Sequence, residues 1–219
     1  MSLVRITQLA VSLDGYATGE GQSVDAPFGH AGGRLMEWMA ATRLGAHVHG
    51  QPATAPFGVD DAMVHAGWDG SIGAEIMGRR KFTPQTGPWA DDGWRGWWGE
   101  EPPFETPVFV MTHHPRPSIE MANGTSFHFV DGSPEEVLAM AREAAGGTDV
   151  RIGGGPTVVR QFLAAGLVDH AHLVIVPIIL GRGVSLWEGL EGIEERYDMR
   201  SVVSPTTGVT HLTMQRRAG

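Results

Sequence analysis

The chain alternates between short apolar runs rich in β-branched residues and longer stretches in which apolar residues recur every three or four positions. Short apolar runs bounded by glycine and polar residues predict buried strands, whereas the three- or four-residue spacing predicts helices. We expect strands near residues 3–13, 74–77, 107–111, 126–130, 150–152 and 173–180. Helices are expected near residues 34–44, 60–64, 134–145 and 156–165, so the pattern predicts an α/β fold.

The end of the chain has a different pattern. Residues 196–203 and 209–214 are two strand-like runs separated by Ser-Pro-Thr-Thr-Gly, which predicts a closing antiparallel hairpin. Within the run 173–180, Pro177 cannot donate a ladder hydrogen bond, so we expect a bulge or a missing bond there.

The length of 219 residues, with 42% apolar and 19% charged residues, predicts a single domain over 1–219, although the length also allows two small domains. Glycine and proline are concentrated in three long loops, at about 17–33, 45–58 and 83–106. The third loop holds four of the seven tryptophans, and the sequence leaves open whether it is a lid or an interface.

One stretch, residues 149–166, carries the strongest chemical signal. A short strand runs into Gly153, Gly154 and Gly155, and Pro156 then opens a helix. Glycines permit positive φ and leave backbone N–H groups uncovered, and a helix N-terminus favours a phosphate. Three glycines alone are more often an ordinary connection between a strand and a helix, so the functional interpretation depends on the neighbouring motifs.

Three further turns follow predicted strands, at residues 12–15, 77–81 and 111–114. In the second, Arg79, Arg80 and Lys81 stand together at a predicted helix start, where three cations oppose the helix dipole unless an anion binds there. In the first, Asp14 beside Gly15 is typical of an Asx turn and is equally a candidate functional carboxylate. The four turns together suit a dinucleotide that carries an extra phosphate.

Charge and composition exclude several classes of protein. The formal charge of −9 argues against a general nucleic-acid binder, and the absence of cysteine excludes thiolate chemistry and Cys-ligated metals. The N-terminus lacks signal-peptide features, and the longest apolar run, 173–180, is too short to span a bilayer. We therefore expect a cytoplasmic protein without nucleic-acid or membrane partners.

The motifs, taken in order, resemble a known family. Residues 10–15 (Ala-Val-Ser-Leu-Asp-Gly), 76–80 (Ile-Met-Gly-Arg-Arg), 152–155 (Ile-Gly-Gly-Gly), 162–169 and 176–183 are similar to the dihydrofolate reductase-like group. Within it they most resemble the reductase (C-terminal) domain of the bifunctional riboflavin biosynthesis deaminase-reductase and its stand-alone bacterial relatives. The resemblance spans nearly the whole chain, with residues 16–70 the least typical.

This resemblance implies a central mixed, mostly parallel sheet flanked by helices, with the antiparallel hairpin at the C-terminus. It also implies NADPH as hydride donor, a small heterocyclic substrate that is pterin- or pyrimidine-like, and a homodimer. A non-enzymatic nucleotide-binding sensor on the same fold is the alternative. A metal enzyme that uses His47 and His49, His113 and His114, or His170 and His172 is a further one.

By position, the resemblance also assigns the site. The glycine turn with Thr157 would hold the pyrophosphate, and the cationic turn with the loop after residue 111 would hold the 2′-phosphate side of the adenosine. Ala10, Val11 and Asp14 would border the nicotinamide, and Asp14, Glu37 or water would relay the proton. The cofactor-binding residues assigned in this way are Ala10, Val11, Gly78, Arg79, Arg80, Thr112, His113, Gly153, Gly154, Gly155, Pro156 and Thr157.

Overall fold

The computed structural model describes residues 2–48, 50–52, 57–67, 70–90 and 93–218. The chain divides into two compact units. The first unit contains Met1–Ile6 and Ser71–Asp169, and the second contains Thr7–Gly70 and His170–Gly219. Strand β1 (Val4–Ser12) begins in the first unit and continues in the second. The expectation of a single domain over 1–219 stays a prediction.

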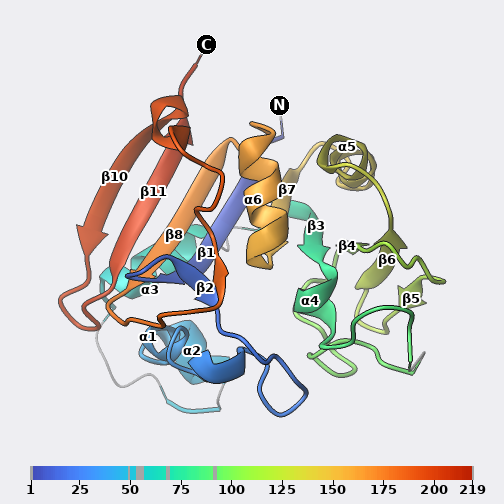
Figure 1. The fold of residues 1–219 in the computed structure, drawn as a ribbon, viewed down its shortest axis with the longest axis horizontal. Helices are drawn as coiled ribbons and strands as arrows, with labels where there is room; N and C mark the ends of the chain where they lie inside the picture. The colour runs from blue at the N-terminus through green and yellow to red at the C-terminus, as the bar shows by residue number, and fades with distance from the viewer. Residues whose placement is uncertain (1, 49, 53–56, 68–69, 91–92, 219) are drawn as a thin grey trace. The chain divides into compact units, whose positions relative to one another are not determined.

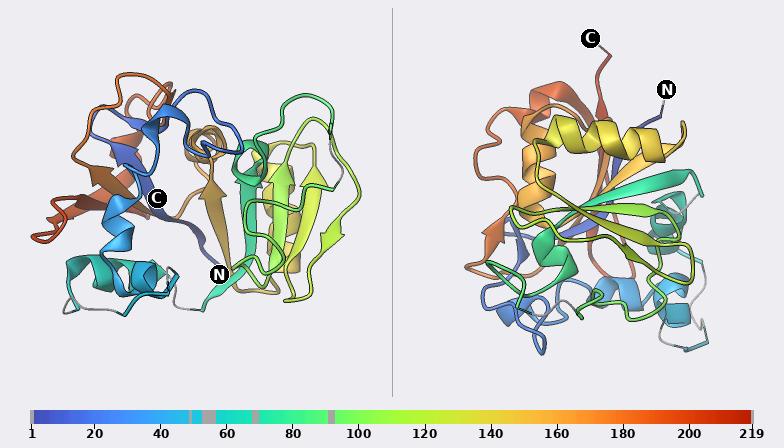
Figure 2. Two further views of the ribbon diagram at one scale, coloured as in Figure 1. Left: turned by 90° about the horizontal axis from the view of Figure 1, so that it is seen from below. Right: turned by 90° about the vertical axis from the view of Figure 1, so that its right-hand side faces the viewer.

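The first unit is built on parallel strands in the order β1-β7-β3-β4-β6-β5. Neighbours from β1 to β6 pair in parallel, and β5 pairs antiparallel with β6. Figure 2 shows β3, β4 and β6 as arrows that run in the same direction. The predicted strands of this unit are thereby confirmed as β3 (Ile72–Gly78), β4 (Pro107–Met111), β6 (Ser126–Val130) and β7 (Asp149–Gly154). The short strand β5 (Ile119–Glu120) was not expected from the sequence.

Two helices cover these strands, and both begin at residues that the sequence marks as helix starts. Helix α5 (Pro134–Ala144) packs on β3 and β4, and Ser133 and Glu136 form the predicted capping box at its N-terminus. Helix α6 (Pro156–Ala164) packs on β7 through Val158, Val159, Phe162 and Leu163. The short helix α4 (Arg79–Phe82) begins directly at the end of β3 (Figure 1).

The tryptophan-rich loop packs against the first unit's own core. Trp89, Trp94, Trp98 and Phe104 contact a buried cluster that includes Phe82. The indole N–H of Trp94 donates to the Phe82 carbonyl (2.9 Å), and that of Trp89 donates to the His114 carbonyl (2.6 Å). Half-buried aromatic rings with satisfied N–H groups fix this loop to its unit.

The second unit contains antiparallel strands in the order β10-β11-β8, followed by β1 (Figure 1). Strands β10 (Tyr197–Val203) and β11 (Thr210–Arg216) form the predicted C-terminal hairpin, which is confirmed. Strand β8 (His170–Val176) ends before Pro177 and does not reach Leu180 as expected, because proline has no N–H to continue the ladder. Strands β2 (Tyr16–Thr18) and β9 (Val184–Ser185) form a separate pair.

Three α-helices and two 3₁₀ turns complete the described part of this unit. The single helix expected at 34–44 is wrong, because the chain forms two short helices there, α1 (Glu37–Ala40) and α2 (Arg43–Val48). The expected loop at 45–58 therefore begins as part of a helix. The break follows from Thr42, whose Oγ1 accepts the N–H of Gly45 at 3.0 Å and caps α2. The predicted helix near 60–64 is confirmed as α3 (Val59–Gly67), and the 3₁₀ turns are η1 (Gly29–Ala31) and η2 (Ile193–Arg196).

A chain of polar side chains runs through the core of the second unit. His172 Nε2 lies 2.9 Å from His211 Nδ1, and His211 Nε2 lies 2.8 Å from Asp60 Oδ1. Asp60 also accepts the hydroxyls of Ser204 (2.7 Å) and Thr207 (3.1 Å). The two histidines and the aspartate are buried, so these hydrogen bonds replace the water that the groups lose on folding.

No helix in the described ranges is both long and apolar enough to cross a membrane.

Candidate functional site

The site residues that the sequence predicts in the first unit meet at one edge of its strands. Strands β7, β3 and β4 are parallel, with Gly154 opposite Met77 and Gly78 opposite Met111, so they end together. In open α/β sheets, ligands bind at the carboxyl ends of the strands. The structure brings to this edge the residues Gly78, Arg79, Arg80, Thr112, His113, Gly153, Gly154, Gly155, Pro156 and Thr157.

The three glycines of the turn differ in what the structure demands of them. Gly154 adopts a φ of +110°, which L side chains rarely tolerate. At Gly153 a Cβ atom would lie 2.0 Å from Glu75 Oε1 and 2.6 Å from Lys81 Nζ. Gly155 is the N-cap residue of α6 and has a φ of −69°. A Cβ atom on Gly155 would lie in open space. Positive φ, the reason expected from the sequence, therefore applies at Gly154, whereas Gly153 is needed for space.

Open backbone surrounds the start of α6. No side chain caps the helix, Pro156 in its first turn has no N–H, and a Cβ on Gly155 would meet no atom within 4 Å. The turn after β3 lies next to it, because a Cβ on Gly78 would be 2.8 Å from Val158 Cγ2 and 3.7 Å from the nitrogen of Gly155. Two bare backbone turns thus approach each other at this edge, which suits the close approach of a phosphate.

A buried ion cluster lies against the glycine turn. Glu75 on β3 is opposite Arg151 on β7, which donates to Glu75 Oε2 from Nε at 2.6 Å and also from Nη2. Lys81 Nζ from α4 lies 2.9 Å from Glu75 Oε1. Burial alone would raise the pKa of Glu75, but the two cations outweigh it and lower that pKa. Glu75 is therefore an ionised carboxylate in the core.

Glu75 and Arg151 were not identified from the sequence. The available signal was an acid inside the otherwise apolar run at 72–78, since a fully buried carboxylate needs a partner. The partner itself could not be read from the sequence, because the pairing depends on the register between β3 and β7.

Gly153→Ala should lower the free energy of unfolding by about 1–3 kcal/mol, the usual cost of overpacking a filled core. The added methyl group would overlap Glu75 Oε1 and displace the ion cluster. Urea unfolding at neutral pH measures the loss. The matched control is Gly155→Ala, where φ is −69° and the space for a Cβ is open, so stability should stay close to that of the wild type. Equal effects of the two substitutions would contradict the packing argument.

The two arginines predicted to bind phosphate differ in their surroundings. Arg79 Nη1 donates to the Gly87 carbonyl, and the guanidinium lies 3.9 Å from the ring centroid of Trp89. Its Nε and Nη2 are buried and donate no hydrogen bond to a described residue. Arg80 is exposed. Arg79 therefore faces the tryptophan-rich loop, and the phosphate role of both residues stays a prediction.

The loop after β4 contains one buried and one exposed site residue. Thr112 is buried; its N–H donates to the Val130 carbonyl at 2.8 Å, and its Oγ1 accepts the N–H of His114 at 3.1 Å. The His113 ring is 92% exposed, and its Nδ1 lies 3.0 Å from Asp131 Oδ1. Thr112 thus shapes the turn, and His113 adds positive charge at this edge when it is protonated.

The remaining predicted residues lie in the second unit. Asp14 Oδ1 accepts the Ser12 hydroxyl (2.6 Å) and the N–H of Leu180 (3.1 Å), and Oδ2 accepts the N–H of Gly181 (2.6 Å). The Ser12 hydroxyl and the two backbone N–H groups lower the pKa of Asp14 to about 2. At neutral pH this group is a carboxylate with no proton to donate, which favours a role as a hydrogen-bond acceptor that ties two turns together.

The other three residues differ in exposure. Ala10 and Val11 are buried in β1, and Glu37 is an exposed residue at the start of α1. The assignments of Ala10, Val11, Asp14 and Glu37 stay predictions.

The metal-enzyme alternative gains no support from the described residues. No three histidine or acidic side chains among them gather closely enough to hold a metal ion. His172 is engaged with His211, and His113 pairs with Asp131. His49, which the alternative also used, lies outside the described residues.

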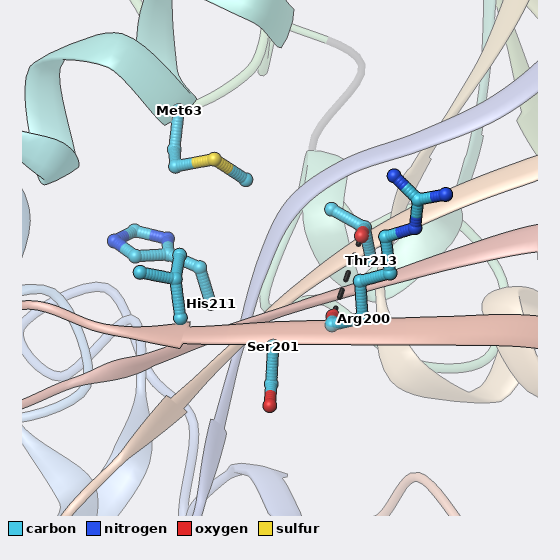
Figure 3. A pocket seen from close by; sticks show the side chains of 6 residues that line it. Met63, Arg200, Ser201, His211 and Thr213 are labelled. Carbon is cyan, nitrogen blue, oxygen red and sulfur yellow. Dashed lines mark hydrogen bonds between the residues drawn. The ribbon is translucent and has the colours of Figure 1, made fainter.

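A small hollow in the second unit is lined by none of the predicted residues. It has a volume of about 130 Å³ and lies between Met63 on α3 and the strands β10 and β11 (Figure 3). Cavities that hold drug-sized ligands measure roughly 300–1,000 Å³, so this one is too small for a dinucleotide. It is lined by Met63, Arg200, Ser201, Val202, His211 and Thr213.

Known protein families and solved structures show what the chain is similar to. Residues 5–210 match the family described as the RibD C-terminal domain. A protein of Shewanella sp. PV-4 assigned to riboflavin biosynthesis superimposes with a TM-score of 0.60 at 20% identity, over 100% of both chains. No curated protein matches the chain.

Dihydrofolate reductase from Enterococcus faecalis, solved in complex with NADP(H) and RAB-propyl, superimposes with a TM-score of 0.51 at 15% identity. The superposition covers 99% of this chain and 97% of the reductase. This likeness confirms the predicted fold, a mixed, mostly parallel sheet flanked by helices with a C-terminal antiparallel pair of strands. With a dihydrofolate reductase-like fold and a family match over nearly its whole length, the chain belongs to the RibD C-terminal domain family.

Proposed function

We propose that the protein is an NADPH-dependent reductase that transfers a hydride to a small heterocyclic substrate of pterin or pyrimidine type. The observation that carries the proposal is the uncapped glycine turn at the carboxyl edge of the first unit, in a chain of this family. The dihydrofolate reductase that shares the fold was solved with NADP(H), which supports a dinucleotide of the same class.

The residues of the first unit fit the phosphate groups of such a cofactor. Backbone N–H groups at Gly155 and Thr157 would hold the pyrophosphate, because no side chain occupies the space in front of Gly155. Arg79 and Arg80, with Thr112 and His113, would hold the 2′-phosphate side, since an arginine fork binds phosphate bidentately. The cofactor supplies the hydride when it is bound.

The residues of the second unit would serve the reacting part of the cofactor and the substrate. Ala10 and Val11 would border the nicotinamide as apolar contacts. Asp14, ionised at neutral pH, would accept a hydrogen bond rather than give a proton. The proton would then come from Glu37 or from water. A homodimer remains part of the proposal, and light scattering on the purified protein tests it.

A thermal-shift comparison of NADPH, NADH, FAD and FMN tests the proposal. NADPH at about 100 times its dissociation constant should stabilise the fold by about 2.7 kcal/mol and produce the largest rise in Tm. NADPH-oxidation assays with pterins and pyrimidines then identify the substrate. Binding without turnover of any candidate would favour the nucleotide-sensor alternative, and no response to either pyridine dinucleotide would overturn the proposal.

Arg80→Ala should weaken NADPH binding at least tenfold more than NADH binding, a loss of about 1.4 kcal/mol of discrimination. The reason is that Arg80 is the exposed member of the pair and the 2′-phosphate is the group that NADH lacks. Fluorescence titration of both cofactors measures the ratio of their dissociation constants. Arg142→Ala, an exposed arginine on α5, is the control and should leave the ratio unchanged. An equal loss for both cofactors would refute the assignment.

A further inference from the structure

The chain contains a single lysine, Lys81, and its side chain lies along the glycine turn. A Cβ atom on Gly153 would be 2.6 Å from Lys81 Nζ, and one on Gly154 would be 3.7 Å from Lys81 Cδ. The Lys81 side chain is 28% exposed, whereas that of Glu75 is fully buried and that of Arg151 is 8% exposed. Lys81 is therefore the most exposed member of the ion cluster, and its side chain lies beside the turn.

The cluster carries more positive than negative charge. Arg151 donates twice to Glu75 Oε2 and can balance that carboxylate by itself. Within the described part of the chain, Glu75 and Arg151 are the charged groups that act on Lys81, so the three side chains together carry one unit of positive charge. The ring of Phe104, 5.7 Å from Nζ, brings no negative group.

The ammonium group also has free donor capacity in this contact. A lysine ammonium has three N–H donors, and the contact with Glu75 Oε1 at 2.9 Å engages one of them. Burial lowers the pKa of Lys81, Glu75 opposes that effect, and Arg151 adds to it. A phosphate beside the ammonium would act in the same direction as Glu75 and favour its charged form.

We propose that Lys81 is a direct ligand of the pyrophosphate of the cofactor, and that it acts together with the backbone N–H groups of the glycine turn. This inference rests on the proposed function, because it names a further residue of the same cofactor site. It differs from the arginine assignment in one measurable way. The pyrophosphate is common to NADPH and NADH, so Lys81 should affect both cofactors equally.

The single lysine allows a direct test. Incorporation of ¹³C,¹⁵N-labelled lysine labels Lys81 alone and leaves its three N–H donors in place. NADPH, NADH and inorganic pyrophosphate should each shift the NMR signal of Lys81 and raise its titration midpoint. Sodium chloride at the same ionic strength is the control and should not move the signal.

Two variants complete the test. Lys81→Met should weaken NADPH and NADH by about the same factor, tenfold or more, whereas Lys81→Arg should retain most of the affinity. The Met variant keeps the Glu75–Arg151 pair, and urea unfolding verifies that it folds. An unmoved Lys81 signal in the presence of bound cofactor, or wild-type affinity in Lys81→Met, overturns the inference and leaves the reductase proposal standing. Failure of the wild type to bind either dinucleotide overturns both.

Discussion

Glu75→Gln should lower the free energy of unfolding by about 3–5 kcal/mol, the cost of removing one partner of a buried ion pair. The substitution keeps the size of the side chain but removes its charge. Lys81 and Arg151, both within hydrogen-bond distance of Glu75, would then face each other with no carboxylate between them. Urea and thermal unfolding at neutral pH measure the loss.

A control separates this effect from a general response to substitution. Glu143→Gln changes an exposed carboxylate on α5 and should alter stability by no more than about 0.5 kcal/mol. If Glu75→Gln costs less than about 1 kcal/mol, the cluster does not hold a charged carboxylate in the way that the geometry indicates.

Acid should destabilise the protein well above the pH at which its carboxylates titrate. Burial, followed by the neighbouring charges of His211 and His170, lowers the pKa of His172 from 6.5 to about 3. In the unfolded chain His172 therefore takes up a proton near pH 6.5, whereas in the folded chain it does so only near pH 3. Stability is fully present above pH 6.5 and falls as the pH drops toward 3.

The expected loss is about 3 kcal/mol between pH 6.5 and pH 4, at about 1.4 kcal/mol for each pH unit. Asp14 has a pKa of about 2 in the folded chain, so its protonation lowers stability only below its ordinary pKa of 3.8. The loss of stability measured above pH 4 therefore comes mainly from His172. Urea unfolding at intervals of half a pH unit gives the slope.

His172→Gln isolates this group. The Gln amide has no titratable proton and places a polar atom where Nε2 contacts His211, so the slope between pH 6.5 and pH 4 should flatten. His65→Asn removes an exposed histidine on α3 and should leave the slope as it is. An unchanged slope in His172→Gln would show that another group takes up the proton.

The sequence predicts those parts of the fold in which local pattern and tertiary packing agree. The capping box at Ser133 and the proline at position 156 mark helix starts that are present in the structure. Buried β-type runs such as 107–111 form strands with the expected bounds. Apolar periodicity failed at 34–44, where the Thr42 hydroxyl bonds to the backbone and begins a second helix.

The sequence predicts the turns that form the candidate site, but it does not predict the side-chain contacts within it. The order of strand ends places Gly78 and Gly154 near one edge, because parallel strands end together. The orientation of Arg79 toward Trp89 depends on how a long loop folds back, and no local pattern encodes that contact. The ion pair between Glu75 and Arg151 depends on strand register, which a single sequence does not show.

The space at Gly153 links two positions that are far apart in the chain. The atom that blocks a side chain at position 153 belongs to residue 75, so a relative with a shorter residue at 75 could accept alanine at 153. Selection would then act on the two positions as a pair, because a substitution at one position would change which residues fit at the other.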